Sequence, residues 1–172
     1  MAANRLMKEL RALRAEQEEV ATAKSEPLSI SLSPENDEDI FEWVAWIRGP
    51  PDTPYEGGYF ELAITIPKRY PLQPPTVVFT TKVFHPNVHW TSGEICIDLL
   101  KTAWSAAYTL QSVCRSIIAL LACPEADSPL NCDAGNLIRM GDTDGFNSLA
   151  RLYTTLFATF PLKPLTTSSP SS

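Results

Sequence analysis

The spacing of apolar side chains in the first part of the chain is helical. Residues 3–19 place leucines three and four positions apart, and basic side chains form a second stripe on the same segment. The leucines are Leu6, Leu10 and Leu13, and the basic residues are Arg5, Lys8, Arg11 and Arg14. This pattern is typical of an amphipathic helix that buries one side against a core. Val20 and the Thr, Ser and Pro residues after it predict the end of the helix.

The period of the pattern then shortens to two, which indicates β-structure. Four segments predict strands, at residues 28–33, 41–48, 59–66 and 76–80. The second segment has one strongly apolar face, made of Phe41, Trp43, Ala45 and Ile47. Turn residues at 33–37 and 56–58 separate the earlier strands, and short turns of this kind favour an antiparallel meander.

Helical spacing returns in the second half of the chain. Thr109 is a suitable N-cap for a helix whose apolar face reads as largely buried, and Asn131 is suited to cap a shorter helix that ends near Met140. Another helix is expected after a break at 141–145. The sequence therefore predicts an α+β fold with an N-terminal helix, a four-stranded antiparallel meander sheet, a central helix under the sheet, and C-terminal helices.

Length and composition are consistent with one compact catalytic domain and short ends. The 172 residues include 44% hydrophobic residues, enough for a full core, so we expect one domain over 1–160. Residues 161–172 are rich in Pro, Ser and Thr and predict a flexible tail. The net charge of −6 argues against nucleic acid or an anionic membrane as the main partner. No uninterrupted apolar run reaches about 18 residues, so no membrane span is expected.

The chemistry of the chain is concentrated around Cys96. This cysteine follows the His85-Pro86-Asn87 step and precedes Trp104. A thiol attacks carbonyl carbon readily, and a thioester retains enough energy to pass its acyl group onward. The side-chain amide of Asn87 is suited to hydrogen-bond the resulting oxyanion. The rival role for this amide is to organise its own turn by bonding to backbone, and both roles are compatible.

A hydrolytic cysteine enzyme is disfavoured by the position of the histidines. The chain has two, His85 and His89, and both precede Cys96 in the same loop. A protease-like site needs a histidine base and a partner for that base, and no downstream His completes such an arrangement. We expect His85 to be structural, and Cys96 to receive acyl groups that are already activated. The four cysteines show no CxxC pair and no zinc-like spacing, so no metal or cofactor is expected.

These motifs resemble the active-site signature of the ubiquitin-conjugating (E2) family. The likeness extends through the turn residues 49–60, the Tyr-Pro and Pro-Pro steps of 70–75 and the Trp104-Ser105 step, and covers about residues 3–158. The resemblance implies the ubiquitin-conjugating (UBC) fold. It also implies that Cys96 accepts ubiquitin as a thioester from the activating enzyme (E1) and transfers it to a substrate.

Within this family, residues 98–112 and 126–131 are similar to the peroxisomal E2 of the peroxin group. This similarity implies monoubiquitination of the recycling peroxisomal import receptor, typically on a cysteine. It implies RING-type ligases (E3) of the peroxisomal membrane and a membrane anchor protein as partners. The chain is then expected to be cytoplasmic and recruited to the cytosolic face of the peroxisomal membrane.

The acceptor side departs from the usual pattern of the family. Ser128 stands where many relatives carry an acidic residue that orients or deprotonates an incoming lysine, and a serine is no such base. Asp127 substitutes only if its side chain points into the cleft. The interval from Asn87 to Cys96 is also one residue longer than in the commonest E2 pattern, which leaves open a shift of Asn87 relative to the thiol. Trp90 in this interval is expected to pack down, with shielding of the thioester as the alternative.

The resemblance also nominates residues for partner binding. In E2 enzymes the N-terminal helix docks the activating enzyme, so Arg5 and Lys8 become candidates. At the ligase-facing edge, Leu72, Ser105 and Ala106 take the places where promiscuous relatives often show Phe and Ser-Pro-Ala. A narrow ligase repertoire is therefore predicted, with plain loop packing as the rival explanation.

Two other functions remain open at this stage. One is a noncatalytic ubiquitin-binding or scaffold module on the same fold, against which the intact motif around Cys96 argues. The other is a general cytosolic E2 for ubiquitin or for a ubiquitin-like protein, because the sequence does not reveal the modifier directly.

Overall fold

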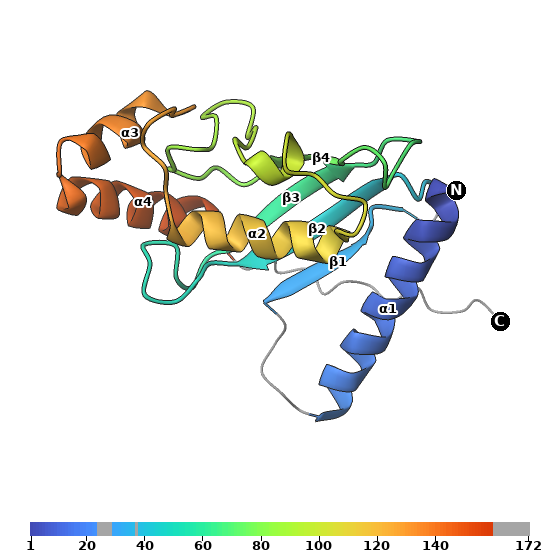
Figure 1. Ribbon diagram of the computed structural model, residues 1–172. Helices are drawn as coiled ribbons and strands as arrows, with labels where there is room; N and C mark the ends of the chain where they lie inside the picture. Colours follow the sequence, from blue (N-terminus) through green and yellow to red (C-terminus); the bar gives the residue numbers. More distant parts are fainter. Residues whose placement is uncertain (24–28, 37, 160–172) are drawn as a thin grey trace.

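The structure is a computed structural model that describes residues 1–23, 29–36 and 38–159. Its centre is a four-stranded antiparallel sheet in the order β1-β2-β3-β4, with helix α2 along one face of the sheet and α1 and the α3–α4 pair toward opposite ends (Figure 1). The predicted α+β arrangement, with an N-terminal helix, a four-stranded antiparallel meander, a central helix and C-terminal helices, is confirmed. The strands are β1 (Ile30–Pro34), β2 (Glu42–Arg48), β3 (Tyr59–Thr65) and β4 (Thr76–Phe79), and the helices are α1 (Ala2–Ala23), α2 (Leu110–Ala122), α3 (Cys132–Arg139) and α4 (Thr143–Phe157).

The apolar face of β2 forms the middle of the core, as its alternation predicts. Trp43, Ala45 and Ile47 are all buried, while the residues between them are half-buried. Each buried residue of β2 lies opposite a buried residue of β3, because side chains paired across antiparallel strands project from the same face. These pairs are Trp43 with Ile64, Ala45 with Leu62, and Ile47 with Phe60.

Helix α1 is longer than the predicted 3–19, and its leucine stripe is buried as expected. A buried carboxylate attaches this helix to the rest of the molecule. Glu9 is only 8% exposed, and it accepts hydrogen bonds from Arg5 Nε at 2.6 Å, Tyr70 Oη at 2.7 Å and the backbone N–H of Leu110 at 2.9 Å. Burial raises the pKa of Tyr70, which keeps its hydroxyl protonated as a donor. One side chain therefore joins α1, the segment after β3 and the first turn of α2.

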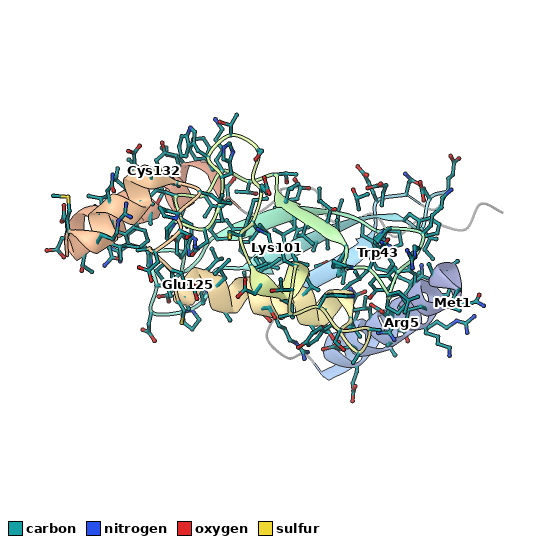
Figure 2. The ribbon with its side chains drawn as sticks, turned by 45° about the horizontal axis from the view of Figure 1, so that its top comes forward. Met1, Arg5, Trp43, Lys101, Glu125 and Cys132 are labelled. Carbon is teal, nitrogen blue, oxygen red and sulfur yellow. The ribbon has the colours of Figure 1, made fainter. Side chains whose placement is uncertain are left out.

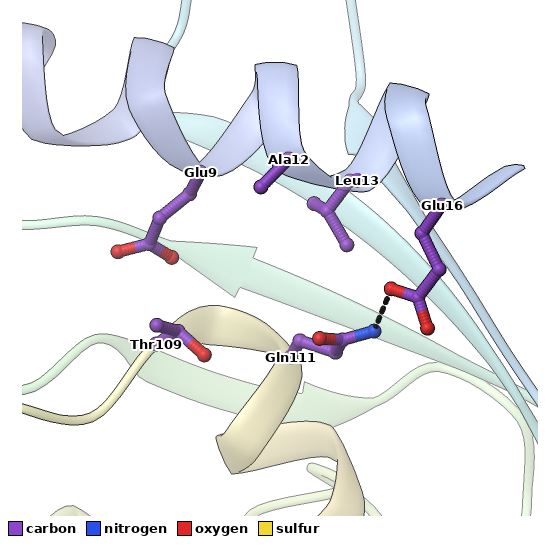
Figure 3. A pocket seen from close by; sticks show the side chains of 6 residues that line it. All are labelled: Glu9, Ala12, Leu13, Glu16, Thr109 and Gln111. Carbon is purple, nitrogen blue, oxygen red and sulfur yellow. Dashed lines mark hydrogen bonds between the residues drawn. The ribbon is translucent and has the colours of Figure 1, made fainter.

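Figure 3 shows this junction, in which Glu9 and Glu16 of α1 face Thr109 and Gln111 across a small cavity. The amide of Gln111 donates to Glu16 at 2.6 Å. The N-terminus of α2 leaves backbone N–H groups without intrahelical partners, and Glu9 supplies one acceptor for them. Glu16, about two turns after Glu9 on α1, adds a second polar contact through Gln111, the residue after Leu110 on α2.

The predicted N-caps of α2 and α3 are confirmed. Thr109 forms a capping box with Ser112, in which each side chain accepts from the other residue's backbone N–H. Asn131 Oδ1 accepts from Ala134 N at 3.2 Å, and Met140 follows the last residue of α3. These helices start where local side chains satisfy orphan N–H groups.

Two predicted turns are shifted in the structure. Helix α4 starts at Thr143, inside the predicted break of 141–145, because Asp142 Oδ1 caps it through Gly145 N at 2.9 Å. Gly141, with φ of 73°, makes the break before that cap. The first strand runs on through Pro34, and the following turn is built on Asn36, whose side chain accepts from the N–H groups of Glu38 and Asp39.

The predicted tail at 161–172 lies outside the described residues. Within the ranges that the structure describes, no helix is both long and apolar enough to cross a membrane.

Replacing Glu9 by Gln tests the junction between α1 and α2. The variant keeps the size of the side chain but removes the charge that accepts from three donors, so the free energy of unfolding should fall by roughly 1–3 kcal/mol. Urea unfolding of the full chain measures this change. Glu38→Gln, at an exposed carboxylate, is the matched control and should stay within about 0.5 kcal/mol of the parent. Equal stability of Glu9→Gln and the parent would contradict the proposed role of the junction.

Candidate active site

Cys96 is held directly against Asn87 by the backbone. The N–H of Cys96 donates to the carbonyl oxygen of Asn87 at 2.8 Å, next to an antiparallel bridge between Val88 and Ile95. The backbones of Asn87 and Cys96 therefore stay in contact, and a further bond from His89 N to Glu94 O at 2.8 Å closes the tip of the loop between them. The thiol is half-buried, so one side of it remains open to a reaction partner.

The tip of the loop is anchored to the sheet and to α4. Gly93 has φ of 71°, and its carbonyl accepts from Phe79 N, the last residue of β4, at 2.9 Å. A Cβ at Gly93 would meet the carbonyl oxygen of Phe79 at 1.9 Å, so this close approach requires glycine. Trp90 packs edge-on against Tyr153 with ring centroids 4.9 Å apart and stays 42% exposed. Trp90 thus contacts α4 through Tyr153 at the outer end of the loop, and it is more exposed than the expected packing down implies.

The side chain of Asn87 organises the loop between α2 and α3, residues 123–131. This loop carries Asp127 and Ser128 and is called the acceptor-side loop. Asn87 is only 3% exposed, its Oδ1 accepts from Glu125 N at 2.8 Å, and its Nδ2 donates to Glu125 O at 2.8 Å. A side-chain amide has two N–H groups, so one donor remains beyond the bond to Glu125. The loop-organising role is visible in these contacts.

The neighbouring Pro86 makes a second set of hydrogen bonds to this loop. The carbonyl oxygen of Pro86 accepts from Leu130 N at 2.8 Å and from Asn131 N at 3.0 Å. Asp127 and Ser128 lie in sequence between Glu125, which bonds to Asn87, and Leu130, which bonds to Pro86. Both are exposed. The loop that carries these acceptor-side residues is thus tied at both ends to the segment that holds Cys96.

His85 is a structural residue, as expected from its position. It is fully buried, its Nδ1 accepts from Asn87 N at 3.1 Å, and its Nε2 lies 3.0 Å from Leu120 O. The neutral ring with its proton on Nε2 satisfies both contacts. Burial lowers the pKa of His85 to about 4, and no nitrogen is left to act as a base for Cys96.

Sequence reasoning missed Lys101. Its Nζ lies 3.8 Å from Cys96 Sγ, directly after the short 3₁₀ helix η1 (Asp98–Leu100). Figure 2 labels Lys101 between the α1 end with Arg5 and the opposite end with Glu125 and Cys132. In the sequence, the only sign of this contact is that Lys101 follows Cys96 by five residues. The turn of η1 is what directs the amine back toward the sulfur.

The other cysteines have no comparable surroundings. Cys114 is buried in α2, and burial raises its pKa to about 12, which leaves it as a small core hydrophobe. Cys123 and Cys132 are exposed free thiols. Over the described ranges, no group of three or more His, Cys, Asp or Glu side chains is arranged to hold a metal ion.

The residues nominated for partner binding are gathered at the α1 end of the molecule. The guanidinium of Arg5 is shared between Glu9 and Tyr108 O, the latter at 2.9 Å. Trp104 Nε1 donates to Pro71 O at 2.8 Å, which joins the loop of Leu72 to the loop of 105–108. Leu72 is 63% exposed. The remaining candidates, Lys8, Ser105 and Ala106, are also exposed.

Comparisons with known proteins agree with this geometry. The family model for ubiquitin-conjugating enzymes matches residues 5–154. The chain belongs to this family, and its activity is that of an E2 ubiquitin-conjugating enzyme.

Its relatives narrow the class further. Over 155 residues, 90% of this chain and 98% of the relative, it is 63% identical to the ubiquitin-conjugating enzyme E2 pex4 of Dictyostelium discoideum. Over 123 residues, 72% of this chain and 78% of the relative, it is 66% identical to protein PEROXIN-4 of Arabidopsis thaliana. The crystal structure of H. polymorpha Pex4p in complex with the soluble domain of Pex22p is similar with a TM-score of 0.84 and 35% identity, covering 92% of this chain and 99% of that one. Within the E2 family, the chain is therefore similar over most of its length to enzymes of the peroxin-4 type.

The buried His85 predicts a specific pH dependence of stability. Its pKa is lowered to about 4 in the folded chain from an ordinary 6.5, so the unfolded chain binds more protons between these values and stability falls as the pH drops through this window. Between pH 7 and pH 5 this group should account for about 2 kcal/mol of lost stability. The measurement is urea unfolding of His85→Gln and the parent at both pH values, and the variant should lose less. His89→Gln, at an exposed histidine, should keep the parental loss, and an equal loss in His85→Gln would contradict the assignment.

Proposed function

We propose that this enzyme receives ubiquitin on Cys96 from the activating enzyme and delivers it to the peroxisomal import receptor, as a single ubiquitin that allows receptor recycling. The observation that carries this proposal is the identity of 63% over 90% of the chain to the Dictyostelium discoideum pex4 enzyme. The intact pairing of Cys96 with Asn87 supports it, because the backbone N–H of one bonds the carbonyl of the other. Ubiquitin-like modifiers other than ubiquitin are the alternative for the cargo.

In the charging step, the Cys96 thiolate attacks the carbonyl carbon of the ubiquitin thioester on the activating enzyme. A new C–S bond forms, the carbonyl oxygen becomes an oxyanion, and the thiolate of the activating enzyme leaves. We place the free N–H of Asn87 Nδ2 as the donor to this oxyanion. Such donors typically contribute about 10²–10³ in rate, and the contact of the other N–H with Glu125 O holds the amide in place.

In the discharge step, the acceptor attacks the thioester on Cys96. An amine acceptor must lose a proton, and the residues around Cys96 offer little to take it, because Ser128 is no base and both nitrogens of His85 are occupied. Asp127 is exposed, and we propose that its carboxylate orients an incoming group. A thiol acceptor ionises more easily, so we propose a cysteine of the import receptor as the acceptor.

The proposed partners are arranged around this reaction. RING-type ligases of the peroxisomal membrane engage the surface of Leu72, Ser105 and Ala106, and the activating enzyme engages α1 through Arg5 and Lys8. A membrane anchor protein brings the enzyme to the cytosolic face of the peroxisome. The complex of H. polymorpha Pex4p with the soluble domain of Pex22p supports a partner of this kind.

The charging step is tested with Cys96→Ala. Incubation of the full chain with activating enzyme, ATP and ubiquitin should give a thiol-sensitive adduct on a nonreducing gel, and Cys96→Ala should abolish it, because the proposed acceptor is the thiol of the residue whose backbone bonds to Asn87. Cys123→Ala is the matched control at an exposed thiol and should charge normally. An adduct that survives in Cys96→Ala would show that Cys96 is not the thioester residue. Charging with another modifier but not with ubiquitin would show that ubiquitin is not the group transferred.

The ligase surface is tested at Leu72, an exposed leucine on the joined loops. Truncation to Ala removes an apolar contact, so the stimulation of discharge by a cognate RING domain should fall by about tenfold, the equivalent of about 1.4 kcal/mol. Each rate is normalised to the same variant without the ligase. Leu152→Ala, at a leucine that is 49% exposed on α4, should retain the stimulation. An equal effect of the two variants would show that the surface is placed wrongly.

A further inference from the structure

Lys101 is the feature of the active site to which the proposed transfer assigns no role. Its Nζ is 3.8 Å from the Cys96 sulfur. The backbone of Lys101 is fixed by its N–H to Asp98 O at 2.9 Å, and Ala103 N donates to the same oxygen. Among the described residues, Lys101 makes no ion pair with a carboxylate. The ammonium therefore presents its charge to the sulfur without a competing anion bound to it.

We propose that Lys101 determines acceptor specificity, by favouring thiols over amines in the discharge of ubiquitin from Cys96. This inference rests on the proposed function, in which Cys96 carries the thioester. It adds a residue that contacts the reacting sulfur and selects the chemical class of the nucleophile.

The charge balance of thiol transfer explains the preference. The acceptor attacks as a thiolate, a C–S bond to the acceptor forms, the C–S bond to Cys96 breaks, and Cys96 leaves as a thiolate. One negative charge approaches the site and one negative charge remains on it. An ammonium 3.8 Å from the sulfur stabilises the leaving thiolate with either acceptor, and it attracts the acceptor only when the acceptor arrives as an anion.

Transfer to an amine forms a C–N bond, breaks the same C–S bond and releases the same Cys96 thiolate, so the two acceptors differ in the charge of the incoming nucleophile. The amine of a lysine side chain arrives mainly as a cation, which the Lys101 ammonium repels. It must then lose a proton before or during C–N bond formation, and His85 offers no free nitrogen for it. Among the described residues, neither Asp98 nor Asp127 forms an ion pair with Lys101. A lysine is a compact point charge, so this selection depends on its position beside the sulfur.

The test is single-turnover discharge of the charged full-length enzyme. The chain is charged with ubiquitin, the activating enzyme is stopped by removing Mg²⁺, and free cysteine or free lysine is added at equal concentration and pH. Lys101→Met keeps the length of the side chain without its charge, and Lys101→Arg keeps the charge. Lys82→Met removes a cation that lies over the ring of Phe157, 5.5 Å from its centroid, and is the matched control.

The expected result is a change in the ratio of the two rates. Lys101→Met should lower the cysteine-to-lysine ratio about tenfold, mainly through slower discharge to cysteine, whereas Lys101→Arg should retain it to within about threefold and Lys82→Met should leave it unchanged. High salt should lower the parental ratio and have little effect on the ratio of Lys101→Met, because the effect is electrostatic.

Three results would overturn the proposal. An unchanged ratio in Lys101→Met would remove the selective role, and an equal loss of both rates would indicate a merely structural one. Capture of ubiquitin by Lys101 itself faster than by added cysteine, seen as an isopeptide on the Lys101 peptide by mass spectrometry, would show that this amine acts as a nucleophile. Failure of the parent chain to form any thioester is a separate result that would overturn the proposed function together with this inference.

Discussion

The active site depends on the hydrogen bonds made by one three-residue segment. His85 donates to the end of α2 at Leu120 O, Pro86 accepts from the acceptor-side loop at Leu130 N, and Asn87 holds Cys96 through its carbonyl and Glu125 through its amide. The nucleophile and the acceptor-side loop therefore share one support. Preorganisation of this kind matters because a transfer reaction needs the carbonyl, the nucleophile and the oxyanion donor in place together.

The rest of the fold holds this segment still. The hydroxyl of the buried Tyr55 donates to Phe84 O at 2.7 Å, directly before His85. On the far side, Gly93 bonds to the last residue of β4 and fixes the loop tip to the sheet. At the α1 end, Glu9 joins three segments and sets the start of α2, the helix whose other end receives His85. A rigid scaffold thus carries a reactive loop, which is the usual division of labour between core and function.

The sequence sufficed for features that depend on near neighbours. Thr109 and Asn131 were recognised as caps because each bonds to an N–H three residues away. Contacts between distant segments were out of reach: Asn87 bonds to Glu125, 38 residues later, and Glu9 bonds to Leu110, 101 residues later. The proximity of Lys101 to Cys96 was missed for another reason, because it depends on the turn of η1 and not on a hydrophobic period. Sequence motifs thus identified Cys96 as the reactive residue, whereas contacts between distant segments determine which side chains surround it.

Amide hydrogen exchange measures whether the side chain of Asn87 holds the acceptor-side loop while its backbone holds Cys96. In the native parent chain, the N–H groups of Cys96 and Glu125 should both be protected, because each donates to an oxygen of Asn87. In Asn87→Ala, Glu125 should exchange at least about tenfold faster, a loss of about 1.4 kcal/mol of protection, while Cys96 stays protected. Unchanged exchange at Glu125, or equal loss of protection at both amides, would contradict this role of Asn87.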